Sequence, residues 1–213
     1  MGSQGDERLR GGTQVILVDY PGIGRSSGEM PSTVAPLTKA CVEFCGALGL
    51  TRFDVLGFSL GGMIAQQLGA DHPEMVRRII LTGTGPRGGE GMVFEELSAD
   101  ELDDEVGLIM NAFFTQSEPS KAAGRAYIER LKLRAENRDA SVSKQAALAE
   151  ANAICEWGVI PQTDRFAMLG QIHHPTLMVH GSKDVVILHP DRRGRRACRS
   201  TWTPILPPCA STT

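Results

Sequence analysis

The stretch Phe53-Asp-Val-Leu-Gly-Phe-Ser-Leu-Gly-Gly-Met-Ile-Ala-Gln-Gln-Leu68 decides the fold of this chain. Residues 53–57 form a short apolar run, which is typical of a buried strand. From Met63 the sequence has the small and apolar residues of a helix, which ends by Pro73 because proline cannot continue it. Ser59 therefore lies in the tight turn between a strand and a helix.

The glycines around Ser59 follow from the geometry of such a turn. Side chains two residues before and after the serine would collide, so Gly57 and Gly61 leave the turn room to form, and Gly62 reduces crowding under the helix. The turn lifts the hydroxyl clear of the sheet. The Leu60 N–H and the helix N-terminus then face a substrate oxygen and favour negative charge there. The pattern predicts a nucleophile rather than an ordinary turn serine.

The rest of the chain indicates an α/β fold. Residues 15–18 are a strand flanked by glycine and proline, and we expect it to be buried on both faces. Residues 32–48 have helical spacing, and further strands are predicted over 78–82 and 175–180. This order predicts a parallel sheet with helices on both faces and a helical insert over one end. The expected domains are a disordered 1–13, a core of 14–91 and 171–188, a helical 92–170, and an irregular tail of 189–213.

From about residue 95 to residue 157 the sequence has only helical signals. Ser98 to Glu101 has the form of a capping box, Ser117 begins a helix that runs to about Asn137, and Ser143 caps another that ends near Trp157. Apolar side chains here either form the insert's own core or line a pocket. They are Leu108, Ile109, Met110, Phe113 and Phe114.

Three motifs together resemble one known family. They are Asp19-Tyr-Pro-Gly-Ile-Gly-Arg-Ser26, Gly57-Phe-Ser-Leu-Gly61, and the strand 175–180 followed by Gly181-Ser-Lys-Asp184. The chain is similar to the α/β-hydrolase fold family, in its serine-nucleophile, cap-bearing, esterase- or lactonase-like branch. The resemblance implies that Ser59 is the nucleophile, that Asp184 is the acid that orients an imidazole, and that 92–170 is a cap domain.

The implied activity is acyl transfer on a small, largely apolar ester or lactone-like substrate, or a related C–C hydrolysis. The family's base is a histidine that follows one further strand after the acid. His189 is the only histidine after Asp184, and only five residues separate the two, so it is a poor fit. The resemblance also implies three strands before Val15, with a second oxyanion donor, and residues 1–13 contain no strand pattern.

The chain therefore looks truncated at both ends relative to the family, and its catalytic competence is open. The alternatives are a non-catalytic α/β-hydrolase-like remnant or binding protein, and an incomplete gene product. Residues 190–213 have no helical or strand period and are crowded with arginine and proline. We favour a misread gene segment here, in place of the final helix, strand and histidine, over a basic interaction tail.

Composition limits the possible partners. The formal net charge of −3 provides no positive field for nucleic acid or an anionic membrane. No apolar run approaches the roughly 20 residues of a membrane span, and the N-terminus has no secretory core. We therefore expect a cytoplasmic protein with a small-molecule substrate, and the oligomeric state is left open.

Neither a metal nor a cofactor is expected. The five cysteines are an odd number without regular spacing, and Cys41 and Cys45 have no second pair to complete a metal site. Gly83-Thr-Gly-Pro-Arg-Gly88 matches the dinucleotide-binding pattern, but Pro86 disrupts the turn and the glycine-rich loop continues past Gly88. We interpret this segment as a connection into the insert.

Overall fold

A computed structural model describes residues 14–89, 104–133, 139, 141–181, 184 and 187. Its sheet has three parallel strands in the order β1-β2-β3. The strands are β1 Phe53–Phe58, β2 Val76–Thr82 and β3 Thr176–Val179. The register aligns Gly57 of β1 with Leu81 of β2, and Leu81 with Met178 of β3. The strands therefore end together, at one edge of the sheet.

The helices confirm most of the sequence pattern. α2 spans Val34–Ala47 and is followed by Gly49, whose φ of 70° is left-handed. α3 spans Leu60–Asp71 and begins earlier than the apolar pattern indicates, directly after Ser59. α7 spans Lys144–Gly158, and the Ser143 hydroxyl caps it as predicted by accepting the Ala146 N–H at 3.1 Å.

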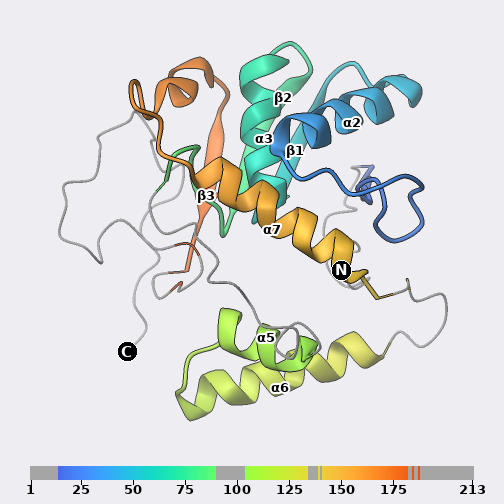
Figure 1. Ribbon diagram of the computed structural model, residues 1–213, viewed down its shortest axis with the longest axis vertical. Helices are drawn as coiled ribbons and strands as arrows, with labels where there is room; N and C mark the ends of the chain where they lie inside the picture. Colours follow the sequence, from blue (N-terminus) through green and yellow to red (C-terminus); the bar gives the residue numbers. More distant parts are fainter. Residues whose placement is uncertain are drawn as a thin grey trace.

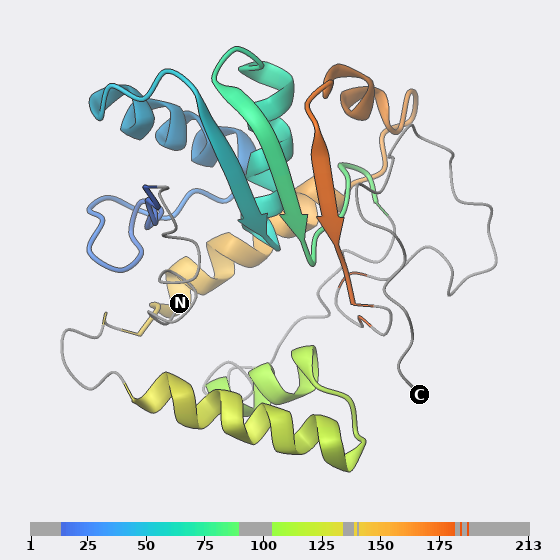
Figure 2. The same ribbon diagram turned by 180° about the vertical axis from the view of Figure 1, so that it is seen from behind.

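One face of the sheet carries the core. α2, α3 and α7 lie on this face (Figures 1 and 2), together with the short 3₁₀ helix η1 Ala167–Gln171, which contacts α3. Leu37 of α2, Met63 of α3 and Trp157 of α7 are buried in one cluster, and Ile79 and Leu81 of β2 are buried in a second. On the opposite face, where helices were also expected, the described part of the chain places none.

The predicted strand over residues 15–18 is wrong. The segment has no strand conformation, and its side chains are largely exposed, Leu17 by 67%. A strand needs a neighbour for its backbone N–H and C=O groups. β1 pairs with β2 on one side only, and no described segment pairs with its other edge. The apolar run therefore lies beside the sheet without joining it.

Two further helices lie beyond the carboxyl ends of the strands (Figure 2). They are α5 Glu105–Phe113 and α6 Glu118–Lys132, which pack against each other. α7, by contrast, packs on α2 and α3. The capping box at Ser98 and the predicted end of α6 near Asn137 lie outside the described residues, and the domain boundaries stay predictions. No described helix is long and apolar enough to cross a membrane.

Candidate active site

Ser59 occupies a strained turn between β1 and α3. Its φ of 51° and ψ of −120° are uncommon for a residue with a side chain. Hydrogen bonds to its backbone hold the conformation. The Ser59 N–H donates to the Thr82 carbonyl at 3.0 Å, and the Ser59 carbonyl accepts the Gly62 N–H at 2.9 Å and the Thr84 hydroxyl at 2.8 Å. β2 and the loop after it thus fix both the N–H group and the carbonyl group of Ser59.

The neighbouring glycines are required by close packing. A Cβ on Gly57 would overlap the carbonyl group of Gly61, which is the collision that the sequence spacing indicates. A Cβ on Gly62 would lie 2.5 Å from Thr84 Cγ2, and one on Gly61 would lie 3.2 Å from the Tyr20 hydroxyl. Larger residues at 57 or 62 would therefore force the turn to move.

The Ser59 hydroxyl is not used to cap α3, although serine is a common capping residue. Leu60 is the first residue of the helix, and its side chain is buried. The first N–H groups of a helix have no partner within the helix, and the helix dipole adds positive potential there. The turn therefore presents a hydroxyl beside a site suited to an oxyanion.

Asp184 lies after β3, at the same edge of the sheet as Ser59. Its Oδ1 accepts the Ile187 N–H at 2.9 Å, and its Oδ2 lies 3.6 Å from His180 Nε2. His180 Nε2 also donates to the Ile187 carbonyl at 2.8 Å. β2 separates β1 from β3, so the backbones at Ser59 and β3 are about 10 Å apart at ordinary strand spacing. The loop that carries Asp184 is thus held by local contacts, and β2 lies between β3 and the strand that leads to Ser59.

The candidate base from the sequence, His189, lies outside the described residues. His174 Nε2 hydrogen-bonds the Pro73 carbonyl at 3.0 Å, and His72 lies 3.8 Å from Glu74. Both positions belong to the turns before β2 and β3, at the amino ends of these strands. Because the strands are parallel and Ser59 follows the carboxyl end of β1, both histidines lie at the opposite end of the sheet from Ser59.

Two residues that contact the elbow, as we call the turn of residues 57–62 around Ser59, were not found from the sequence. Thr84 is buried and donates to the Ser59 carbonyl, but its sequence context is only a glycine-rich loop. Tyr20 packs against the main core cluster, with its hydroxyl beside Gly61. Burial raises the Tyr20 pKa, and Cys41 and Glu150 raise it further. A tyrosine in a turn motif gives no signal that it packs under the neighbouring helix.

The loop after β2 contacts both α3 and α7 through hydrogen bonds and an ion pair. Residues 83–89 form no helix, in agreement with their interpretation as a connection. The Gly85 carbonyl accepts both Gln66 Nε2 and Trp157 Nε1 at 3.1 Å, and Arg87 pairs with Glu156. Among the described residues there is no cluster of three or more potential metal ligands.

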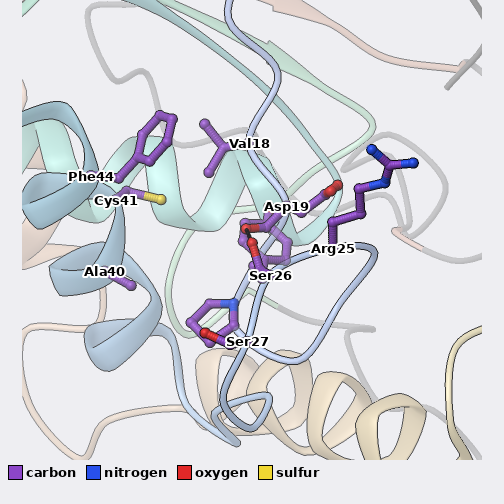
Figure 3. A pocket seen from close by; sticks show the side chains of 10 residues that line it. Val18, Asp19, Arg25, Ser26, Ser27, Ala40, Cys41 and Phe44 are labelled. Carbon is purple, nitrogen blue, oxygen red and sulfur yellow. Dashed lines mark hydrogen bonds between the residues drawn. The ribbon is translucent and has the colours of Figure 1, made fainter. Parts of the chain in front are cut away.

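A pocket of about 380 Å³ lies between residues 18–27 and α2 (Figure 3). The Cys41 thiol and the Phe44 ring from α2 face Val18 across it. Burial raises the pKa of Cys41 to about 11, with a smaller contribution from Cys45. Tyr20, whose hydroxyl lies beside Gly61, lines this pocket, and Ser59 does not.

Comparison with known proteins identifies relatives. The chain is 38% identical to an alpha/beta hydrolase fold protein from Chitinophaga pinensis, with a TM-score of 0.77 over 85% of this chain and 66% of that one. It is 25% identical to Est816, described as an N-acyl homoserine lactone degrading enzyme, with a TM-score of 0.59 over 85% and 69% of the two chains.

A shorter match connects the chain to a curated esterase. Over 86 residues it is 35% identical to the pimeloyl-[acyl-carrier protein] methyl ester esterase of Edwardsiella ictaluri, which covers 40% of this chain and 32% of that protein. The chain thus matches about a third of this relative and about two thirds of the solved structures. The family model of the alpha/beta hydrolase fold matches residues 5–191, and the chain belongs to that family.

Proposed function

We propose that this chain is a serine hydrolase that acts by acyl transfer on a small, largely apolar ester or lactone-like substrate. The observation that carries the proposal is the backbone of Ser59, which is held in a left-handed conformation between β1 and α3. Nothing in the packing of the core requires a serine there. Backbone strain of this kind persists where the surrounding structure fixes it, and it is concentrated at functional sites.

In the proposed reaction, Ser59 Oγ attacks the carbonyl carbon and its proton passes to a base. The Leu60 N–H stabilises the oxyanion, the alcohol leaves, and water then hydrolyses the acyl-serine. Asp184 orients the imidazole that serves as base and stabilises its positive charge. His189 is the candidate for this imidazole among the residues after Asp184.

The relatives support the reaction class. A methyl ester esterase and a lactone-degrading enzyme both cleave a bond at an acyl carbon, which is the chemistry that a serine nucleophile performs. The choice between ester and lactone depends on the groups around the elbow. Neither relative fixes that choice for this chain, because function depends on the site rather than on the fold.

A fluorophosphonate probe tests the proposal directly. We expect Ser59 to be phosphonylated and Ser59→Ala to abolish labelling, while Asp184→Asn slows labelling by several orders of magnitude. Ser26→Ala is the matched control, because Ser26 is a turn serine whose hydroxyl donates to the Asp19 carbonyl. Labelling at another serine, or a cooperatively folded protein without labelling, would contradict the proposal. The latter result would favour a binding protein.

A further inference from the structure

An aromatic contact joins the elbow to the helices beyond the sheet edge. Phe58, the residue before Ser59, lies with its ring centroid 5.9 Å from that of Phe113, the last residue of α5, at an interplanar angle of 47°. Both side chains are exposed, by 38% and 56%. Gly83 leaves room for this arrangement, since a Cβ there would lie 3.0 Å from the Phe58 ring.

Phe113 differs from the other large side chains at the end of α5. Met110 of α5 and Phe114, the extended residue that follows the helix, both lie against Gly124 of α6. Phe114 also lies 6.1 Å from the Tyr127 ring of α6. Phe113 contacts Phe58 instead, while Met110 and Phe114 hold the end of α5 to α6.

We propose that Phe58 and Phe113 together bind the apolar part of the acyl group, and that Phe113 selects substrates by acyl chain length. This inference rests on the proposed function, because it places the scissile carbonyl at Ser59. Phe58 ends β1 and Phe113 ends α5, which lies beyond the carboxyl ends of the strands (Figure 2), and both side chains are exposed. The preferred substrate class is esters or lactones of straight-chain acids long enough to pass Phe58.

The physical basis is burial of apolar surface. An acyl chain that begins at Ser59 passes Phe58 first and reaches Phe113 only when it is several carbons long. Each methylene removed from water between the rings strengthens binding by about 0.8 kcal/mol, which is about fourfold in affinity. An acetyl group is too short to obtain this gain.

The test is calorimetric binding of butyrate, hexanoate and octanoate, in which no bond is broken. We expect affinity to rise by about fourfold per methylene in the wild type, and this dependence to disappear in Phe113→Ala. Phe113→Leu should retain part of it, because leucine keeps apolar surface at the same place. Circular dichroism checks that the variants stay folded.

Phe44→Ala is the matched control, because Phe44 is an exposed phenylalanine of α2 that lines the pocket between residues 18–27 and α2. Chain-length dependence that survives in Phe113→Ala, or that is lost in Phe44→Ala instead, would overturn the inference. An affinity that does not change with chain length in the wild type would also overturn it. Labelling of Ser59 with an unchanged dependence removes this inference alone. Loss of the dependence in Phe113→Ala without labelling of Ser59 would remove the acyl-transfer proposal and leave the two rings as a binding site for an apolar chain only.

Discussion

Two apolar runs of similar composition have opposite fates in this molecule. Residues 176–179 are Thr-Leu-Met-Val and form β3, whereas residues 15–18 are Val-Ile-Leu-Val and form no strand. β3 lies beside β2, with Ile80 opposite Leu177 and Thr82 opposite Val179. Residues 15–18 have no such neighbour among the described residues. Strand formation here is decided by an available partner edge rather than by apolar content.

The difference extends to the side chains around each run. On the β2 side, Ile79 and Leu81 are buried between the sheet and α3. On the β1 side, Leu17 is exposed, and Leu56 of β1 itself is exposed on the uncovered face. An unpaired edge and apolar side chains in water are features that proteins ordinarily cover. The stability of the molecule should therefore be concentrated at β2.

The largest expected effect tests this concentration. Ile79→Ala should lower the free energy of unfolding by about 2–5 kcal/mol, because Ile79 is 1% exposed and its removal leaves a cavity. Leu17→Ala should change it by less than about 0.5 kcal/mol, because the side chain is already in water. Urea unfolding with a common slope measures both. Equal effects would show that the Leu17 side chain is buried in solution, and the comparison would fail.

The sequence indicates the elbow and the strands around it because their constraints are local. Gly57 and Gly61 are set by contacts within a few residues of Ser59, and Ser143 caps its own helix. The strand over 15–18 was wrong because its outcome depends on what lies beside β1. An apolar run contains no information about its neighbour.

The parts of the site that the sequence does not reveal are contacts between distant segments. Thr84 holds Ser59 from a loop 25 residues away. The position of Phe113 beside Phe58 depends on how α5 packs on α6. Apolar spacing in the insert left both the core and the pocket possible for Phe113. The choice between these two positions for Phe113 follows only from the packing of Met110 and Phe114 against α6.

A smaller effect reports on the open side of the molecule. Cys41 faces Val18 across the pocket, and its raised pKa of about 11 keeps the thiol protonated at pH 8. We expect it to react with a disulfide reagent on the order of tenfold to a hundredfold more slowly than an exposed thiol. Its rate should rise with pH until about 11, because the thiolate is the nucleophile.

This measurement requires a variant in which the other four cysteines are replaced by serine, with Cys41→Ser as the blank. If residues 15–18 move away from α2 in solution, Cys41 becomes solvated and its pKa approaches the ordinary value near 8.5. Rapid reaction at pH 8 would then show that the open side is looser than the structure describes. Slow reaction would show that residues 15–18 pack on α2 even without pairing with a strand.

The smallest effect concerns the paired edge of β1. Arg77 of β2 donates two hydrogen bonds to Asp54 of β1, at 2.8 and 2.6 Å, and Arg78 lies 3.9 Å away. The hydrogen bonds with Arg77, aided by both positive charges, lower the pKa of the Asp54 carboxyl. A carboxyl whose pKa is lower when folded stabilises the fold above its unfolded pKa of about 3.9, and this stability is lost as pH falls through the folded pKa. The contribution is small because the pair is exposed.

Carboxyl NMR of Asp54 tests this pair. It should give a pKa below the ordinary value in the wild type, and the pKa should return to the ordinary value in Arg77→Ala. A normal Asp54 pKa in the wild type would mean that the β1–β2 edge relies on its backbone ladder alone.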